Sequence, residues 1–247
     1  MLLDHIVHFS TRTPKEVVED WKQQGFHAVV GGQHIQWGTH NALLYTKNSY
    51  IEWLALENKD VALKSNHPLV NLLLHDIETG PGYGTICIRT NNIKDIESKL
   101  KGQGIKTSGI LQAERKTANG QTKKWEMLFV QEEVNDSLPT PFFIQWEEED
   151  ERRLQLLQED GLIQKENLQQ SIVGCEFHVH NPRNIMDKWK SYFGLEEIEE
   201  GILLLGKTKL IFKQSGNLQR ERLVSVYIEG HNKKEVITYE QAAYRFV

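Results

Sequence analysis

The chain has 247 residues, 39% of them hydrophobic and 26% charged, which is enough apolar material for one large or two modest domains. A formal net charge of -5 and a pI of about 6.1 provide no basic surface for nucleic acid or anionic lipid, so we expect neither partner. No run of 18 apolar residues predicts a membrane span, and the opening residues lack the apolar stretch of a signal peptide, which favours a cytoplasmic protein.

The first 57 residues contain a pattern that recurs along the chain: an apolar strand, an amphipathic helix that ends near glycine, and three short strands. The opening strand is "LDHIVHFS", after which Val17, Val18 and Trp21 follow at helical spacing before Gly25. The next strands are "FHAVVGG", "NALLYTK" and "YIEWLALE". Residues 58–82 then form a connector, in which "HPLVNLLLHDI" predicts a helix that packs over one end of the sheet.

The pattern recurs twice in full and then begins again without completing. The second copy has helical spacing at Ile93, Ile96 and Leu100 and continues with the strands "IKTSGILQ", "WEMLFVQ" and "FFIQWEE". The third copy runs from "EFHVH" to "KLIFKQS". A fourth starts with "RLVSVYIEG", but the polar "HNKKE" stands where its helix is expected. One helix covers only one face of its sheet, so we expect the copies to pair.

These patterns predict an α+β fold of tandem βαβββ modules that pair, with the last module truncated. We expect two modules in residues 1–147, a linker with a short solvated helix in 148–171, and the third and truncated fourth modules in 172–247. Cys87 and Cys175 lie in strand-like segments without the spacing of a zinc site or disulfide framework, so we expect both to be buried as small apolar residues.

One carboxylate stands out, because Glu52 lies in the otherwise apolar strand "YIEWLAL". A buried ionised carboxylate costs several kcal/mol unless it is paired, hydrogen-bonded or bound to a metal. Glu52 is therefore either a site residue or a structural partner of a residue such as Arg115, Lys123 or Tyr45.

The repeated module, with "LDHIVHFS" at its start and "SYIEWLALE" at the end of its first copy, resembles the vicinal oxygen chelate superfamily. Within that superfamily the chain is most similar to the glyoxalase-like proteins, through "GGQHIQWGTHNALL", "NGQTKKW" and "PFFIQWEE". The resemblance implies that the paired modules form two cup-shaped sheets. The superfamily includes glyoxalases, epimerases, ring-cleaving dioxygenases, thiol transferases and metal-free drug-binding proteins, so the resemblance leaves the chemistry open.

The resemblance also implies a set of metal ligands. Metal-binding members place His or Gln on the first strand of a module and Glu on the last, and His5 and Glu52 occupy those places in the first module. The second module offers Gln145 where a Glu is expected, so the implied ligands of a divalent metal ion are His5, Glu52 and Gln145. Strand alternation agrees for His5, which shares a face with Val7 and Phe9.

Two further residues are candidates for catalysis. His40, in "GTHN", could lean over the mouth of the cup and transfer a proton, or it could only hydrogen-bond the loop backbone. The nearby His34 could also lean over the mouth of the cup and transfer a proton, and either histidine could instead serve there as a third metal ligand. Arg115 begins a predicted hairpin that turns at Asn119-Gly120, and it could bind a substrate carboxylate or enolate if it points inward. If it points outward, it is a solubilising charge.

Two functional hypotheses follow. The first is a metal-dependent lyase, isomerase or dioxygenase that acts on a small oxygenated metabolite in the first cup. The alternative is a metal-free protein that binds or sequesters such a molecule, for which a tryptophan-lined cup is suited. The edge of the truncated module could also pair with a second chain and form a homodimer.

Overall fold

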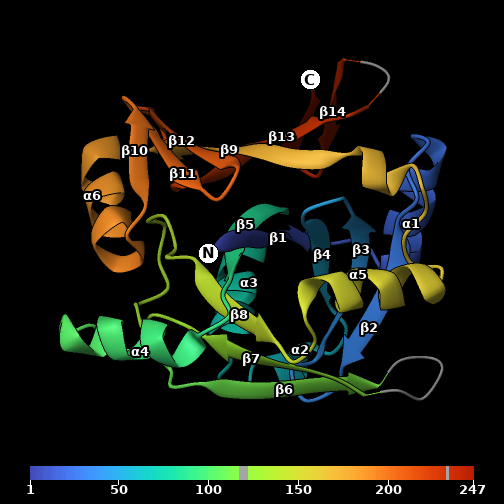
Figure 1. Ribbon diagram of the computed structural model, residues 1–247, viewed down its shortest axis with the longest axis horizontal. Coiled ribbons are helices and arrows are strands. Elements are labelled where there is room, and N and C mark those ends of the chain that lie inside the picture. Colours follow the sequence, from blue (N-terminus) through green and yellow to red (C-terminus); the bar gives the residue numbers. More distant parts are fainter. Residues whose placement is uncertain (117–121, 232–233) are drawn as a thin grey trace.

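The computed structural model describes residues 1–116, 122–231 and 234–247, apart from the side chains of Arg115 and Lys116. The strands in these residues form two sheets, which lie one above the other with helices at their flanks (Figure 1). The predicted α+β fold of βαβββ modules is confirmed, and no helix precedes β14 in the described residues of the truncated fourth module.

The first two modules build one continuous sheet, in the order β2-β3-β4-β1-β5-β8-β7-β6. β1 pairs in parallel with β4 and β5 with β8, while antiparallel pairing of β1 and β5 joins the two modules at the centre. The elements are β1 (Leu2–Ser10), α1 (Pro14–Gln23), β2 (Val29–His34), β3 (Thr39–Tyr45), β4 (Tyr50–Leu56), α2 (Lys59–Ala62), α3 (Pro68–Ile77), β5 (Gly82–Arg89), α4 (Ile93–Gly102), β6 (Leu111–Lys116), β7 (Thr122–Leu128) and β8 (Phe142–Trp146).

The second sheet repeats this arrangement in the order β10-β11-β12-β9-β13-β15-β14. β9 pairs in parallel with β12 and β13 with β15, and β9 and β13 are antiparallel at the centre. Helix α5 (Asp150–Glu159) and a short 3₁₀ helix (Asn167–Gln169) connect the sheets. The remaining elements are β9 (Ser171–Val179), α6 (Pro182–Phe193), β10 (Glu196–Glu199), β11 (Ile202–Leu205), β12 (Thr208–Gln214), β13 (Arg222–Glu229), β14 (Glu235–Tyr239) and β15 (Ala242–Phe246).

Capping residues start the helix of each full module at the same place after its first strand. Thr13 and Glu16 form a capping box, in which the Thr13 backbone N–H donates to Glu16 Oε2 at 2.8 Å and the Glu16 N–H donates to Thr13 Oγ1 at 3.4 Å. Asn92 and Asn181 accept from backbone N–H groups at the starts of α4 and α6. Gly194, with φ of 68°, ends α6 in the left-handed conformation that glycine favours.

The sequence predicts a strand over residues 105–112, and this prediction is wrong for residues 105–110. Gly104 and Gly109 have φ of 77° and 72°, so the chain turns twice there and cannot run as an extended strand. Only an isolated bridge between Thr107 and Val130 forms before β6 begins at Leu111.

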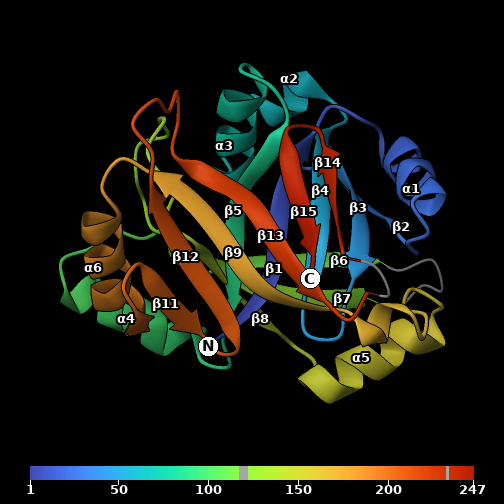
Figure 2. The ribbon, with the colours of Figure 1, turned by 90° about the horizontal axis from the view of Figure 1, so that it is seen from above.

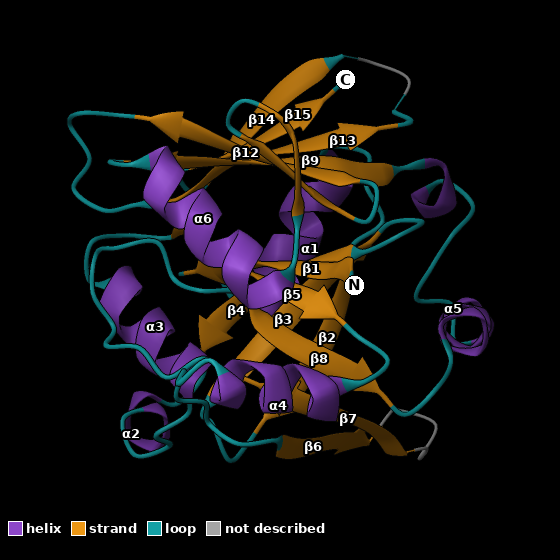
Figure 3. Cartoon of the chain, turned by 60° about the vertical axis from the view of Figure 1, so that its left-hand side comes forward, coloured by secondary structure: helices purple, strands orange, loops and turns teal. Residues whose placement is uncertain are grey.

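The two faces of the first sheet have different roles. Ile6 and Trp53 on one face belong to a core that also includes α1, α4, α6 and the apolar face of the second sheet, whereas Val7 and Phe9 on the other face line a separate apolar cluster. Figure 2 shows β13 and β15 crossing over β1 and β4, and Figure 3 shows α6 and α4 on one flank between the sheets. The second sheet therefore covers the back of the first.

Polar contacts fix how the sheets stack. The Tyr244 hydroxyl on β15 lies 2.6 Å from His8 Nδ1 and accepts a hydrogen bond from Trp53 Nε1 at 3.0 Å, and all three side chains are buried. His8 is thus held against the second sheet. Cys87 and Cys175 are fully buried free thiols, as expected. No helix in the described residues is long and apolar enough to cross a membrane.

Candidate functional site

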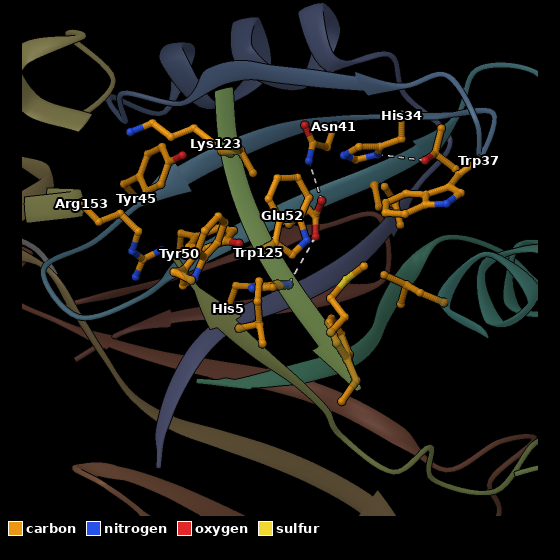
Figure 4. Close-up of a pocket in the computed structure, with 18 of the residues that line it drawn as sticks. His5, His34, Trp37, Asn41, Tyr45, Tyr50, Glu52, Lys123, Trp125 and Arg153 are labelled. Carbon is orange, nitrogen blue, oxygen red and sulfur yellow. Dashed lines mark hydrogen bonds and ion pairs between the residues drawn. The ribbon is translucent and has the colours of Figure 1, made fainter. Parts of the chain in front are cut away.

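The inner face of the first sheet curls around a cavity of about 100 Å³ (Figure 4). β1, β3 and β4 form one wall, β7 and β8 form the opposite wall, and residues of α3 and α5 close the ends. Most of the lining is apolar or aromatic, and it consists of Trp37, Leu43, Leu54, Leu69, Val70, Trp125, Met127, Phe142, Ile144, Trp146, Leu157 and Leu162. Against this surface a small number of polar groups can orient a ligand.

His5 lies in this cavity because Asp4 holds its ring from behind. His5 Nδ1 is 2.7 Å from Asp4 Oδ1, and the His5 ring stacks on Tyr50 with centroids 4.5 Å apart. Asp4 is fully buried, and Trp146 Nε1 donates to its Oδ2 at 3.0 Å. Burial alone would raise the pKa of Asp4, but Arg153, the hydrogen bond with His5 and Arg89 hold it well below its usual value. Asp4 is thus an anion that fixes the imidazole.

Glu52 lies beside His5 in the same cavity. Its side chain is almost fully buried, at 8% exposure, and Oε1 accepts a hydrogen bond from Asn41 Nδ2 at 2.5 Å. Asn41 is oriented in turn by Gly32, whose backbone N–H donates to Asn41 Oδ1 at 2.7 Å. A Cβ at Gly31 would approach Asn41 Oδ1 to 2.0 Å, so glycine is required there for Asn41 to hold this position.

The second oxygen of the carboxylate faces the imidazole. Glu52 Oε2 is 3.5 Å from His5 Nε2, and Figure 4 shows the two side chains pointing toward each other from β4 and β1. If His5 donates from Nδ1 to Asp4 while neutral, Nε2 presents a lone pair to the carboxylate, and two acceptors then face each other. A proton on Nε2 removes this conflict, because it makes His5 an imidazolium between two carboxylates.

The other predicted site residues do not join this pair. Gln145 lies on the opposite face of β8, where its Oε1 accepts from the backbone N–H of Ile93 at 2.8 Å at the start of α4. His40 lies on the opposite face of β3, and its Nδ1 is 3.9 Å from Glu57 Oε1. Burial lowers the pKa of His40, and Glu57 opposes that effect. The Arg115 side chain and the predicted turn at 119–120 lie outside the described residues.

Comparisons with known proteins agree with this architecture. The family model for the glyoxalase-like domain matches residues 3–193. The chain belongs to the glyoxalase-like domain family. A hypothetical protein from Staphylococcus aureus has a similar structure, with 26% identity, a TM-score of 0.82, and coverage of 99% of this chain and 98% of that chain. The resemblance to the vicinal oxygen chelate superfamily is therefore confirmed.

More distant structures match part of this glyoxalase-like chain. Methylmalonyl-CoA epimerase from Streptomyces coelicolor, in complex with 2-nitronate-propionyl-CoA, has 15% identity and a TM-score of 0.40, and the match covers 59% of this chain and 96% of that chain. A hypothetical protein from Bacillus halodurans has 16% identity and a TM-score of 0.40, over 60% of this chain and 94% of that chain. At these scores the likeness supports no argument about chemistry. No curated protein matches the chain.

Many relatives in the vicinal oxygen chelate superfamily use a divalent metal ion, which requires a suitable set of protein donor atoms. Catalytic sites hold a divalent ion with three protein ligands. His5 Nε2 and Glu52 Oε2 supply two donors, but among the described residues the one group of three close donors is Asp4, His5 and Cys87. Within that group His5 Nδ1 and Asp4 Oδ1 already contact each other at 2.7 Å, and Asp4 Oδ2 also accepts from Trp146 Nε1 at 3.0 Å. The side chains do not fit a divalent ion.

The sequence analysis missed His67 as a site residue of the glyoxalase-like domain. His67 lies at the N-cap of α3, lines the cavity and is 6% exposed. Neither ring nitrogen has a hydrogen-bond partner among the described atoms, and a buried unpaired polar group costs roughly 1–3 kcal/mol. One signal was present in the sequence, because the N-cap favours Ser, Thr, Asp or Asn, and a histidine before Pro68 does not cap the helix.

Proposed function

We propose that this protein is an isomerase or lyase that moves a proton next to the carbonyl of a small oxygenated metabolite bound in the first cup. The single observation that supports this is the pairing of Glu52 with His5 inside an aromatic cavity, 3.5 Å apart and each held by its own partner. A base and an acid in fixed positions, within reach of one ligand, are the components of general acid–base catalysis.

The proposed step uses only residues of this chain. Glu52 removes a proton from the carbon next to the carbonyl, and the electron pair of that C–H bond moves into the carbonyl to give an enolate. His5, protonated on Nε2 while Asp4 accepts from Nδ1, donates to the enolate oxygen. Where that carbon carries a hydroxyl, Glu52 returns the proton to the former carbonyl carbon while the hydroxyl gives its proton to His5 Nε2. The C–H bond and the carbonyl thereby exchange places, and both side chains regain their starting protonation states. Tyr50, whose pKa burial raises well above its usual value, remains a neutral phenol against His5.

A metal-dependent form of this function, including dioxygenase chemistry, is the less favoured version of the proposal. It needs a third protein ligand, and Gln145 is engaged with the N-terminus of α4.

The test is exchange of carbon-bound protons. Hydroxyacetone and cyclohexanone are incubated with the protein in D₂O, and ¹H NMR follows the loss of the signals next to the carbonyl. We expect exchange above the buffer rate, and a loss of about a hundredfold or more in Glu52→Gln. Glu57→Gln is the matched control, because Glu57 lies just beyond β4 outside the cavity and bonds to Gln33. An unchanged rate in Glu52→Gln, or no exchange by the natural chain, would contradict the proposal.

A second candidate function is binding without reaction. The observation that favours it is the lining of the cavity, where aromatic and aliphatic side chains outnumber polar ones. In that case the natural chain would bind cyclohexanone without exchanging its protons.

We also propose that edge strand β14 pairs with a second copy of the chain. It ends the second sheet, and its Val236 is 53% exposed. Light scattering should then give twice the 28.6 kDa chain mass, and Val236→Lys should lower it. A single-chain mass for the natural protein at all concentrations would contradict this.

A further inference from the structure

His67 lies on the connector between the first two modules, outside the repeated strands and helices, and its side chain lines the cavity. It precedes α3, the ten-residue helix that connects the first two modules, and its side chain makes no capping hydrogen bond there. Its ring packs against Trp37, with centroids 4.3 Å apart, and meets the edge of Phe129 at 5.3 Å. These two contacts fix the ring in the wall of the cavity that His5 and Glu52 also line.

The imidazole presents two unsatisfied groups to whatever fills the cavity. Burial lowers the pKa of His67 to about 4, with a smaller contribution from His34, so the ring is neutral at neutral pH. A neutral imidazole has one N–H donor and one acceptor nitrogen, and neither is used within the described part of the chain. Because buried polar groups in proteins are almost always hydrogen-bonded, a matching group on a ligand is the natural complement.

The surroundings of His67 favour an uncharged ligand group. The side chains around the ring are Trp37, Phe129, the apolar start of α3 and, close enough to affect its pKa, the imidazole of His34, whose Nδ1 lies 3.0 Å from Thr39 Oγ1. Lys123, a cation in the lining, has its Nζ 3.1 Å from Glu148 Oε1, and Arg153 lies over the Trp146 ring with its Nη2 3.6 Å from Asp4. A carboxylate beside His67 would therefore lose its water without gaining a cation.

We propose that His67 binds a second oxygen of the ligand, and that the substrate class is a small, uncharged cyclic ketone with a hydroxyl or a second carbonyl on the same ring. The position of the reacting carbonyl rests on the function proposed above, whereas the His67 contact does not. A ring suits the cavity because Trp37, Trp125 and Phe142 offer flat surfaces, and about 100 Å³ leaves room for little more than one ring.

Two probes that differ only in the second oxygen test this inference. Cyclohexanone and 4-hydroxycyclohexanone are titrated into the protein, and NMR shifts of the protein give their dissociation constants. We expect 4-hydroxycyclohexanone to bind about three- to tenfold more tightly, the effect of one additional hydrogen bond. His67→Phe keeps a flat ring without the nitrogens and should bind the two probes equally, while His67→Gln should retain part of the preference.

His40→Phe is the matched control, because His40 belongs to a neighbouring strand but faces away from the cavity. It should leave the preference unchanged, and thermal unfolding checks that each variant is folded. Equal binding of the two probes by the natural chain, or a preference that survives in His67→Phe, overturns the inference.

The same samples separate this inference from the proposed function. If the preference depends on His67 but no protons exchange, the reaction is wrong and the His67 contact is right. If protons exchange without a preference for the second oxygen, the reaction stands and the His67 contact is wrong.

Discussion

Replacement of Arg222 should destabilise the fold strongly, because its buried guanidinium joins three segments of the chain. Its Nε and Nη2 donate to the two carboxylate oxygens of Asp76 at 2.8 Å each, at the end of α3. The guanidinium also donates to the backbone carbonyls of Asn135 and Ser137 at 2.9 and 2.7 Å. The Arg222 and Asp76 side chains are 5% and 2% exposed, so neither has water as an alternative partner.

The variant Arg222→Met keeps most of the side-chain volume and leaves Asp76 buried without its main partner. Loss of one member of a buried pair costs about 3–5 kcal/mol. Arg220 Nη1 lies 3.5 Å from Asp76 Oδ1 and can offset part of this, so we expect the lower end, about 3 kcal/mol. If the free energy of unfolding falls by about 3 kcal/mol per molar urea, the urea concentration at the midpoint of unfolding should fall by about 1 M.

The control is Arg183→Met, since Arg183 also makes two contacts to one carboxylate, that of Glu197, but on the surface with 61% of its side chain exposed. We expect a change of at most about 1 kcal/mol there. Circular dichroism during urea unfolding measures both variants. In a double-mutant cycle, adding Asp76→Leu to Arg222→Met should restore part of the loss. If Arg222→Met shifts the midpoint no more than Arg183→Met, the buried pair does not hold these segments together.

Three further predictions follow from other contacts. Burial would raise the pKa of Glu240, but the neighbouring His8, whose Nε2 lies 3.4 Å from Glu240 Oε2, and the hydrogen bonds donated by the Thr11 N–H and Oγ1 lower it to about 2. The contribution of Glu240 to stability is therefore complete above about pH 4.5 and is lost as the pH falls toward 2, and Glu240→Gln should reduce the change of the urea midpoint over that range. Tyr244→Phe leaves His8 Nδ1 and Trp53 Nε1 unpaired and should cost about 2 kcal/mol in the same assay, and a change below about 0.5 kcal/mol would mean that the hydroxyl is dispensable. Calorimetric titration with Zn²⁺ or Mn²⁺ should show no stoichiometric binding, whereas binding that disappears in Glu52→Gln would restore the metal-dependent hypothesis.

The sequence predicted the modules because their signals are local. Alternating strands, asparagine and threonine caps and glycine stops act within a few residues, and each full module shows them in the same order. His5 and Glu52 were found for a similar reason: each interrupts an apolar strand, and the module plan brings their strands side by side.

The rest of the site depends on features that a single strand does not show. Gln145 follows Ile144 by one position, and that one-residue difference turns it from the cavity toward α4. His40 is similarly one position from Asn41, which does line the cavity. His67 lies on a connector whose path over the sheet no periodic pattern describes, and the N-cap it leaves unused was its one visible signal.

The core shared by the two sheets decides whether the first half of the chain could fold alone. Trp53 and Ile6 are sealed by side chains of the last module, including Tyr244, although the cavity itself is built almost entirely before residue 163. Residues 1–147 alone would expose that aromatic surface to water, so we expect the half of the chain that contains most of the cavity to need the C-terminal half for stable folding.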